Sequence, residues 1–477
     1  MKITSQIIRN AQTTPDKPAI LSGAESYSYD DLKRNIHLIA SEIEKLELTP
    51  EAPIAICMPN CAEFVFCLCA SEITGHCALL LNSKFRNNEL TYHINSANTG
   101  YLFALAGSEI DFTSYGFTVI KQAANIAIWE KANISAAAEY YPGDYICQIT
   151  SGTIGNAKGA IRTVDAVKGE IEDVLNSAGI TNEDVFLVTS PVCHSFGLVP
   201  GTLAPLYTGA TVFFYTDYIP ANIIKNIVKH NVTALVAVPF LYQIILDSKV
   251  KIDSSHSLRL CLTAGAPTPA NTIQKFKDFC GAYITQIYGT TETGAMCLNN
   301  NPGEHILSVG KPLGDRQFKI SQIENQKGVL ATKSKNDASR YLYPQVLNSQ
   351  FKEGWLSLGD IASIDDEGYV YVHGRQSNFI NVAGMKVDPV EVEKALMELD
   401  GVKETVVIGE PSELYGETVK AFIVTKENLD KKLIINHCRE RIADYKVPKK
   451  IEFINEIPKS ETGKILYRYL RGEQQWN

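Results

Sequence analysis

The sequence predicts an α/β protein with a large N-terminal domain and a small C-terminal domain. Its 477 residues are too many for one hydrophobic core, so two or more domains are expected. Through most of the chain, short apolar runs alternate with amphipathic helical patterns, and such strand–helix–strand units indicate sheets of largely parallel strands. About the last hundred residues mix strands and helices differently, as is typical of a small α+β domain.

The expected elements of the large domain are short. Residues 53–60, PIAICMPN, predict a strand, and residues 61–75 predict the helix that follows it. Apolar residues at helical spacing predict another helix over 222–231. Three further apolar runs of buried-strand length are 185–191, 211–215 and 234–239.

The domain boundary is expected near Gly374, which gives domains of residues 1–374 and 375–477. Before it, residues 354–375 read as turns and short antiparallel strands. After it, a helix is expected over 388–399, because Asp388 can act as its N-cap and Pro389 suits its first position. The other elements expected in the small domain are strands over 404–409 and 419–425 and a helix over 432–444.

Composition and charge exclude several classes of protein. The net charge of −8 argues against a surface that coats nucleic acid. The N-terminus lacks an apolar core region, so it does not read as a secretory signal. The longest apolar stretch, around 64–81, is interrupted by Ser71, Glu72 and His76, so no membrane span is expected.

The eleven cysteines are spread from Cys57 to Cys438 and include no C-x-x-C pair. This arrangement argues against a structural zinc site. We expect most of them to be small buried apolar residues of a cytoplasmic protein, where thiols stay reduced.

The stretch TSGTIGNAKG, residues 150–159, has the composition of a phosphate-binding loop. It is not a Walker loop, because Gly159 follows Lys158 where a hydroxyl residue is needed. It is not a dinucleotide fingerprint either, because its first glycine spacing runs from Gly152 to Gly155. By itself, a loop of this composition is more often a flexible surface turn between strands.

Further motifs follow this loop in a fixed order. They are CHSFG (193–197), TAGAP (263–267), YGTTETG (288–294), GWLSLGD (354–360), GRQSNFINVAGMKV (374–387) and PKSETGKILYRYLR (458–471). Together they resemble the adenylate-forming superfamily of acyl- and aryl-CoA synthetases, stand-alone adenylation enzymes and firefly luciferase. The resemblance implies a large domain of stacked α/β subdomains with a small β-barrel-like part, and a mobile C-terminal domain that carries the catalytic lysine.

The implied chemistry is the activation of a carboxylic acid by ATP. A thiol cannot displace oxide from a carboxylate, so the carboxylate first attacks the α-phosphate and pyrophosphate leaves. The acyl-adenylate then offers AMP as a leaving group to a thiol. Such an enzyme works mainly by positioning and charge stabilisation, with ATP, Mg²⁺ and coenzyme A as the implied cofactors.

The resemblance implies a role for each nucleotide motif. The loop would hold the β- and γ-phosphates through Thr150, Ser151, Gly152, Thr153 and Lys158. Ile154 and Ala157 depart from the family's loop, which has a hydroxyl residue and a proline there. Glu292 would ligate Mg²⁺, which prefers oxygen ligands. Other implied nucleotide contacts are the adenine wall Gly265, Ala266 and Pro267, the YGTT segment Tyr288, Gly289, Thr290 and Thr291, and the ribose ligands Asp360 and Arg375.

The resemblance assigns the main catalytic role to Lys464, which would bridge the carboxylate and the α-phosphate; considered singly, it would read as a solvated surface charge. Thr291 would contact the α-phosphate. The small domain would pivot at Ser377 between the two half-reactions, and Gly384 would let the arm of the thiol pass close to the backbone.

Phe196 bears on the acid, because relatives that activate α-amino acids carry an aspartate at about this position. A buried ammonium group without that partner is costly, so an aryl, aryl-alkenyl or fatty acid is expected instead. His194 resembles the histidine near the substrate carboxylate, although a structural histidine is the alternative. Phe240 and Met296 are candidates for the acyl pocket, or else ordinary core residues.

Coenzyme A is the favoured acceptor, and the rival is the phosphopantetheine arm of an acyl or peptidyl carrier protein. An inactive relative that only binds nucleotide is the alternative from another class. A luciferase-like oxygenase has no distinctive support. The joint presence of several functional residues argues against inactivity: Lys158, Thr291, Glu292, Asp360, Arg375 and Lys464.

Overall fold

The computed structural model describes residues 2–49, 52–85, 87–132, 139–150, 158–253, 255–324, 326–345, 351, 354–375, 380–382, 385–412, 416–426, 429–460 and 463–472. Two compact units are apparent in the contacts of the chain. The first unit comprises Met1–Gln317, Thr332–Leu356 and Asp366–Val370. The second unit comprises Phe318–Ala331, Ser357–Asp365 and Tyr371–Asn477.

The first unit contains a nine-stranded sheet, here called the first sheet, in the order β16-β15-β14-β13-β12-β10-β11-β1-β2. Strands β1 and β10 to β14 are parallel, whereas β2 and β15 run antiparallel to their neighbours. The bounds are β1 Pro18–Ser22, β2 Glu25–Ser28, β10 Val185–Val188, β11 Thr211–Phe214, β12 Ala234–Val236, β13 Leu260–Thr263, β14 Ile284–Thr290, β15 Gly294–Leu298 and β16 Lys311–Pro312.

The second sheet of this unit has eight strands in the order β19-β9-β8-β4-β3-β5-β7-β6. Its central strands β8, β4, β3 and β5 are parallel. The bounds are β3 Ile54–Cys57, β4 Ala78–Leu81, β5 Tyr101–Leu105, β6 Phe117–Ala123, β7 Ile126–Lys131, β8 Asp144–Ile149, β9 Gly159–Thr163 and β19 Arg340–Tyr343.

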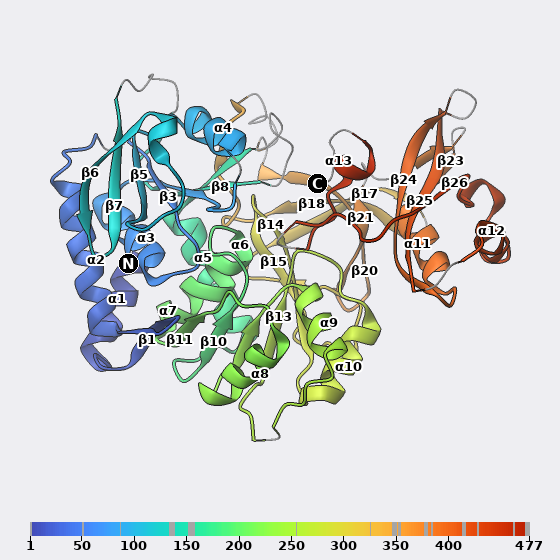
Figure 1. Cartoon of the computed structure of the whole chain (residues 1–477), viewed down its shortest axis with the longest axis horizontal. Coiled ribbons are helices and arrows are strands. Elements are labelled where there is room, and N and C mark those ends of the chain that lie inside the picture. The colour runs from blue at the N-terminus through green and yellow to red at the C-terminus, as the bar shows by residue number, and fades with distance from the viewer. Residues whose placement is uncertain are drawn as a thin grey trace. The chain divides into compact units, whose positions relative to one another are not determined.

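Helices cover both faces of each sheet in this unit. One large core joins one face of both sheets to helices α1 Ile3–Thr13, α2 Tyr29–Glu44, α3 Ala62–Thr74, α5 Val164–Ala178, α6 Ser195–Leu198 and α7 Ala204–Thr208. The opposite face of the first sheet packs on α8 Pro220–Lys229, α9 Pro239–Asp247 and α10 Ala270–Cys280, which lie in the lower part of Figure 1. The opposite face of the second sheet packs on α4 Asn87–Ala97.

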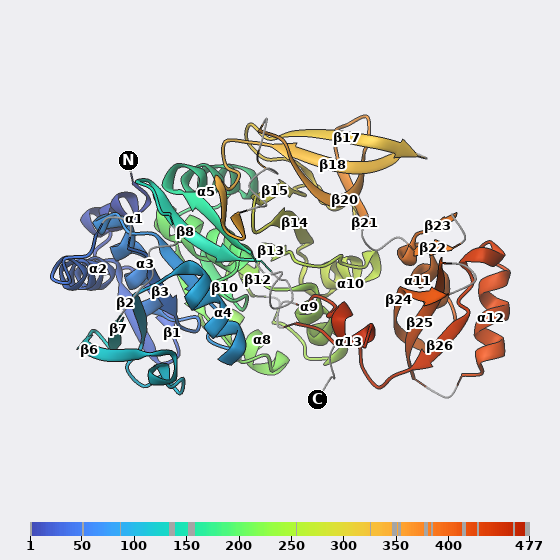
Figure 2. The same cartoon turned by 90° about the horizontal axis from the view of Figure 1, so that it is seen from above.

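The second unit contains most of a four-stranded sheet, β17-β18-β20-β21, and a C-terminal α+β part. The strands are β17 Gln317–Glu324, β18 Lys327–Lys333, β20 Leu356–Ile364 and β21 Val370–Arg375, of which β17 and β18 form the long ribbon in Figure 2. Among the described strands this sheet stays open, with no closed barrel.

The C-terminal part is a five-stranded sheet in the order β23-β22-β25-β24, with β26 paired to β25. Helices α11 Pro389–Met397 and α12 Lys431–Arg439 pack on one face, and α13 Tyr467–Leu470 packs on the other. Its strands are β22 Ile380–Val382, β23 Met385–Val387, β24 Val402–Ser412, β25 Gly416–Thr425 and β26 Lys450–Phe453.

The fold class predicted from the sequence is confirmed. The strand expected in 53–60 is β3 and the helix expected after it is α3, and Asp388 caps α11 by accepting a hydrogen bond from the Val390 amide. The helix expected over 432–444 is α12, but its predicted end was wrong, because α12 ends at Arg439. Cys438 is its last buried residue, and Ile442 reaches the core from the turn that follows.

All eleven cysteines are buried and none forms a disulfide, as expected for small apolar residues. Burial raises the pKa of most of these thiols, to about 12 for Cys57. No helix within the described ranges has the length and apolar character needed to cross a membrane.

Candidate nucleotide-binding site

The predicted site residues of the first unit follow the carboxyl ends of its parallel strands. Thr150 follows β8, and Tyr288, Gly289 and Thr290 form the end of β14. The adenine-wall candidates Gly265, Ala266 and Pro267 follow β13. In open α/β sheets, ligands bind in the crevice outside these strand ends.

Thr150 and Lys158 close the base of the predicted phosphate loop, a segment we call the 150–158 loop. The Thr150 amide donates to the Lys158 carbonyl at 2.9 Å, and the Lys158 amide donates to the Thr150 Oγ1 at 3.1 Å. The predictions for Ser151, Gly152 and Thr153, and the departures at Ile154 and Ala157, lie outside the described residues. The two ends of the loop therefore lie side by side, because β8 before it and β9 after it pair in antiparallel fashion.

Lys158 and Glu292 meet at the phenol of Tyr341. The Lys158 Nζ lies 3.4 Å from the Tyr341 hydroxyl and 4.6 Å from the centre of its ring. The hydroxyl in turn donates to the Glu292 Oε1 at 2.8 Å. Burial, reinforced by the Glu292 carboxylate, raises the pKa of the Tyr341 phenol, which therefore stays protonated and can donate. A cation and a carboxylate are thus held on either side of one tyrosine.

Glu292 and Thr291 lie at the tip of the hairpin formed by β14 and β15. The Thr290 amide donates to the Thr293 Oγ1 at 3.1 Å, and the Thr293 amide donates to the Thr290 carbonyl at 3.3 Å. These two bonds close the turn. Gly289 is required beneath it, because a Cβ there would overlap the carbonyl of Gly294.

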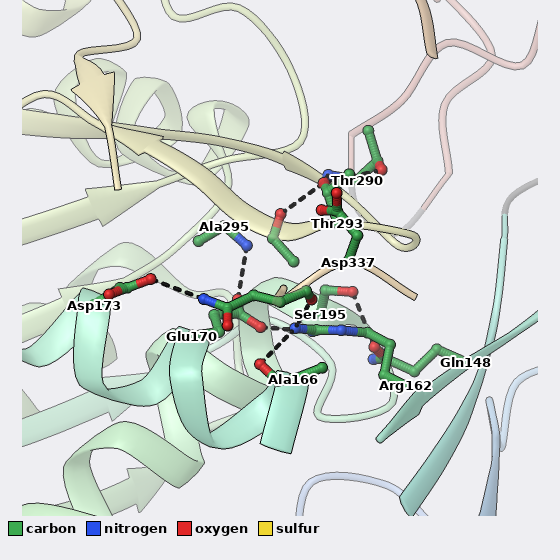
Figure 3. Close-up of polar contacts among 12 residues, drawn as sticks. Gln148, Arg162, Ala166, Glu170, Asp173, Ser195, Thr290, Thr293, Ala295 and Asp337 are labelled. Atoms are coloured by element: carbon green, nitrogen blue, oxygen red, sulfur yellow. Dashed lines mark hydrogen bonds and ion pairs between the residues drawn. The ribbon is translucent and has the colours of Figure 1, made fainter. Parts of the chain in front are cut away.

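A buried ion pair holds the β15 strand of this hairpin in place. Arg162 on β9 and Glu170 on α5 are joined at 2.5 Å, and both side chains are at most 1% exposed. The second oxygen of Glu170 accepts the Ala295 amide at 2.7 Å, as Figure 3 shows. The Arg162 Nη2 also donates to the Asn336 carbonyl at 3.0 Å. Arg162 and Glu170 therefore tie the start of β15 to both β9 and α5.

A second arginine fixes the other side of the turn. The Arg316 Nη2 donates to the Thr293 carbonyl at 3.1 Å, and its Nη1 pairs with Asp337 at 2.7 Å. Burial raises the pKa of Asp337, and Arg316 opposes that shift. Ala338, next to Asp337, donates its amide to the Glu292 carbonyl at 2.6 Å. The backbone that carries Glu292 is thus anchored at several points.

We expect Gly294→Ala to destabilise the protein. Gly294 has a φ of +62°, and an added Cβ would overlap the Glu170 carboxylate and lie 2.8 Å from the Arg162 Nη1. Left-handed strain costs about 1–2 kcal/mol, and overpacking adds roughly 1–3 kcal/mol. The control is Gly281→Ala, where φ is +77° and nothing lies within 4 Å of the added carbon. Urea unfolding should show a clearly larger loss for Gly294→Ala; equal losses would contradict the packing argument.

The predicted acid-side residues lie in different surroundings. His194 precedes α6, whose Ser195 donates to the buried amide of Gln148 at 3.1 Å. Phe196 is partly buried against the large core. Phe240 is 54% exposed on α9, whereas Met296 on β15 is fully buried. These residues are supplied by three separate elements.

The remaining predicted residues belong to the second unit. Asp360 is buried on β20, and Arg375 ends β21, the neighbouring strand. Lys464 is exposed; its amide donates to the Ser460 Oγ at 3.2 Å, and its carbonyl accepts from the Ser460 amide at 2.8 Å. Ser377 and Gly384 lie outside the described residues.

Two family models match the chain. The model of the AMP-binding enzyme covers residues 7–342, and that of the AMP-binding enzyme C-terminal domain covers residues 391–464. The chain belongs to the AMP-binding enzyme family. Its recognition as adenylate-forming is thereby confirmed.

This AMP-binding enzyme is similar to characterised ligases over almost its whole length. It is 27% identical to the 2-succinylbenzoate–CoA ligase of Bacillus subtilis, covering 98% of this chain and 97% of the relative. It is 28% identical to a feruloyl-CoA synthase of an Amycolatopsis species, over 96% of each chain. A structure of o-succinylbenzoate CoA synthetase from Bacillus subtilis with its acyl-adenylate intermediate matches with a TM-score of 0.84 at 26% identity, covering 98% of this chain and 97% of that one.

Reasoning from the sequence missed several residues that position this site. A signal existed for Arg162, because a charged residue inside the apolar strand GAIRT needs a buried partner, and Glu170 lies eight residues further on. No local signal pointed to Tyr341, whose contacts with Lys158 span 183 positions.

The donor set around Glu292 fits a magnesium ion that arrives with phosphates. Mg²⁺ is commonly held by one or two carboxylates together with substrate phosphates and water. Glu292 supplies one carboxylate, whose Oε1 is occupied by Tyr341. The described residues include no cluster of three His, Cys, Asp or Glu side chains that could form an all-protein cage.

Proposed function

We propose that this AMP-binding enzyme is an acid–thiol ligase. It uses ATP to convert a carboxylic acid into an acyl-adenylate with release of pyrophosphate, and then transfers the acyl group to coenzyme A. The observation that carries the proposal is the meeting of Lys158 and Glu292 at Tyr341, beside the 150–158 loop. That arrangement offers a cation for phosphate oxygens and a carboxylate for Mg²⁺ at one place.

In this proposal the first unit binds the triphosphate. The 150–158 loop, with Thr150 and Lys158 at its base, holds the β- and γ-phosphates. Thr291 contacts the α-phosphate and Glu292 receives Mg²⁺, which would neutralise phosphate charge. Tyr288 stacks on the adenine, next to the wall of Gly265, Ala266 and Pro267.

The second unit supplies the ribose and catalytic contacts. A carboxylate such as Asp360 can accept hydrogen bonds from both ribose hydroxyls, and Arg375 adds a further contact. Lys464 stabilises the negative charge that builds up between the carboxylate and the α-phosphate. Ser377 serves as the hinge, and Gly384 admits the thiol arm during the second half-reaction.

The acid is an aryl, aryl-alkenyl or fatty acid. Phe196 cannot pair with an ammonium group, so an α-amino acid would leave a buried charge without a partner. The two relatives named above are, by their names, a 2-succinylbenzoate–CoA ligase and a feruloyl-CoA synthase, which is in keeping with an aryl or aryl-alkenyl acid. His194 would lie near the substrate carboxylate, with Phe196, Phe240 and Met296 as candidates for the acyl pocket.

Coenzyme A is the proposed acceptor, because the relatives named above are a CoA ligase and a feruloyl-CoA synthase. Transfer to a carrier protein is the alternative acceptor reaction, and an inactive nucleotide-binding relative is the alternative of another class. A cytoplasmic location belongs to the same proposal, supported by eleven cysteines that form no disulfide.

Exchange of labelled pyrophosphate into ATP tests the proposal directly. A panel of aryl, aryl-alkenyl, fatty and α-amino acids should give acid-dependent exchange with at least one of the first three classes and none with the amino acids. Adding coenzyme A, or a carrier domain bearing phosphopantetheine, then identifies the acceptor from the thioester formed. If the protein binds ATP but none of the acids supports exchange, the inactive relative is favoured.

A further inference from the structure

Tyr341 occupies the position between two charged groups that come from distant parts of the chain. It lies on β19, which pairs with β9 so that Tyr341 faces Ala160, directly after the base of the 150–158 loop. Its side chain is only 2% exposed, and its ring meets that of Phe351 edge-on at 5.0 Å. The phenol therefore has a fixed location.

Tyr341 interacts with Lys158 and with Glu292 in chemically different ways. Toward Lys158 the ring offers a cation–π contact at 4.6 Å, and the hydroxyl oxygen can accept a hydrogen bond. Toward Glu292 the hydroxyl donates at 2.8 Å to one carboxylate oxygen, Oε1. A donor on one oxygen fixes the orientation of the carboxylate and directs its other oxygen toward a metal ion.

We propose that Tyr341 is a positioning residue that sets the metal-ligating orientation of Glu292 through its hydroxyl and the location of Lys158 through its ring. This inference rests on the proposed function, in which Glu292 receives Mg²⁺ and Lys158 contacts phosphate. The hydroxyl and the ring have separable roles, so two substitutions divide them.

Tyr341→Phe removes only the hydroxyl. We expect the Mg²⁺ concentration for half-maximal pyrophosphate exchange to rise by about tenfold, because loss of a partner that orients a metal ligand typically weakens metal binding 10–100-fold. The affinity for ATP without Mg²⁺ should change less, since the cation–π contact of Lys158 with the ring at 4.6 Å remains and only its long hydrogen bond of 3.4 Å to the hydroxyl is lost. Tyr341→Leu removes the ring as well. It should also weaken the binding of ATP without Mg²⁺ by a few-fold, because the cation–π contact with Lys158 is lost.

The matched control is Tyr343→Phe. Tyr343 lies on the same strand, and its hydroxyl contacts the His93 Nδ1 at 2.9 Å. Its removal should leave the Mg²⁺ dependence unchanged. The proposal would be overturned if Tyr341→Phe had the same Mg²⁺ dependence as the wild type. It would also be overturned if Tyr341→Phe lost ATP affinity equally with and without Mg²⁺.

Calorimetric titration of the full chain with ATP, in MgCl₂ or in EDTA, separates this inference from the proposed function. That measurement needs no acid substrate, so it reports on Tyr341 even if no acid supports exchange. Unfolding temperatures of the variants identify any general loss of stability. Wild-type protein that binds no ATP in MgCl₂ would overturn both proposals.

Discussion

Replacing Lys464 by alanine is expected to lower acyl-adenylate formation by roughly 10²–10³-fold, the loss typical when one preorganised charge-stabilising donor is removed. Lys464 is exposed on the second unit, so the substitution leaves no cavity in a core. The effect should therefore appear in pyrophosphate exchange with little change in the unfolding temperature. Thioester formation from an adenylate prepared in advance should largely survive, because the proposed role of the lysine ends when pyrophosphate leaves.

Lys459→Ala is the control for this experiment. Lys459 lies in the same segment and pairs with Glu404, so its replacement removes one positive charge near Lys464. Partly exposed pairs of this kind contribute about 0–1 kcal/mol, and exchange should stay close to the wild-type rate. Unchanged exchange in Lys464→Ala would mean that the catalytic role is misassigned, whereas equal losses in both variants would indicate a general charge effect.

Glu170→Gln is expected to reduce the free energy of unfolding by about 3–5 kcal/mol, the usual cost of removing one partner from a buried ion pair. The amide can still accept from the Ala295 amide, but it leaves the Arg162 guanidinium without a counter-ion in a fully buried position. Because this pair supports the hairpin that carries Glu292, exchange activity should fall as well. Urea unfolding monitored by circular dichroism measures the stability.

Glu172→Gln is the matched control on the same helix. Glu172 pairs with Lys168 at 2.6 Å, but the Glu172 side chain is 46% exposed. The same chemical change there should cost about 0–1 kcal/mol. If the two variants lose equal stability, burial is not what makes the Arg162–Glu170 pair important.

Local patterns were sufficient to predict the fold class. The alternation of apolar strands and amphipathic helices can be read from neighbouring residues and does not depend on tertiary contacts. Asp388 followed by Pro389 marked the start of α11 for the same reason, since a cap acts within one turn. The end of α12 was missed because the apolar pattern continues to Ile442 after the helix has stopped. The division at Gly374 stays a prediction; the contacts assign 318–331 and 357–365 to the second unit as well.

The candidate site could be predicted only where a motif is contiguous. Lys158, Thr291 and Glu292 were proposed from such motifs, but the residues that hold them in place were not. Tyr341 joins Glu292 across 49 positions, and Glu170 joins Ala295 across 125. Such contacts depend on how strands from distant segments come together, and a single sequence carries no record of that pairing.

The burial of every native thiol makes the protein suited to site-specific labelling. A maleimide reacts with an accessible thiolate, and both accessibility and ionisation are suppressed at positions such as Cys57. Cysteines introduced at the exposed positions Glu183 and Lys432, one in each unit, would therefore react ahead of the native ones. A pair of fluorophores attached there could report the distance between the two units through a catalytic cycle, and the native cysteines would not first have to be replaced.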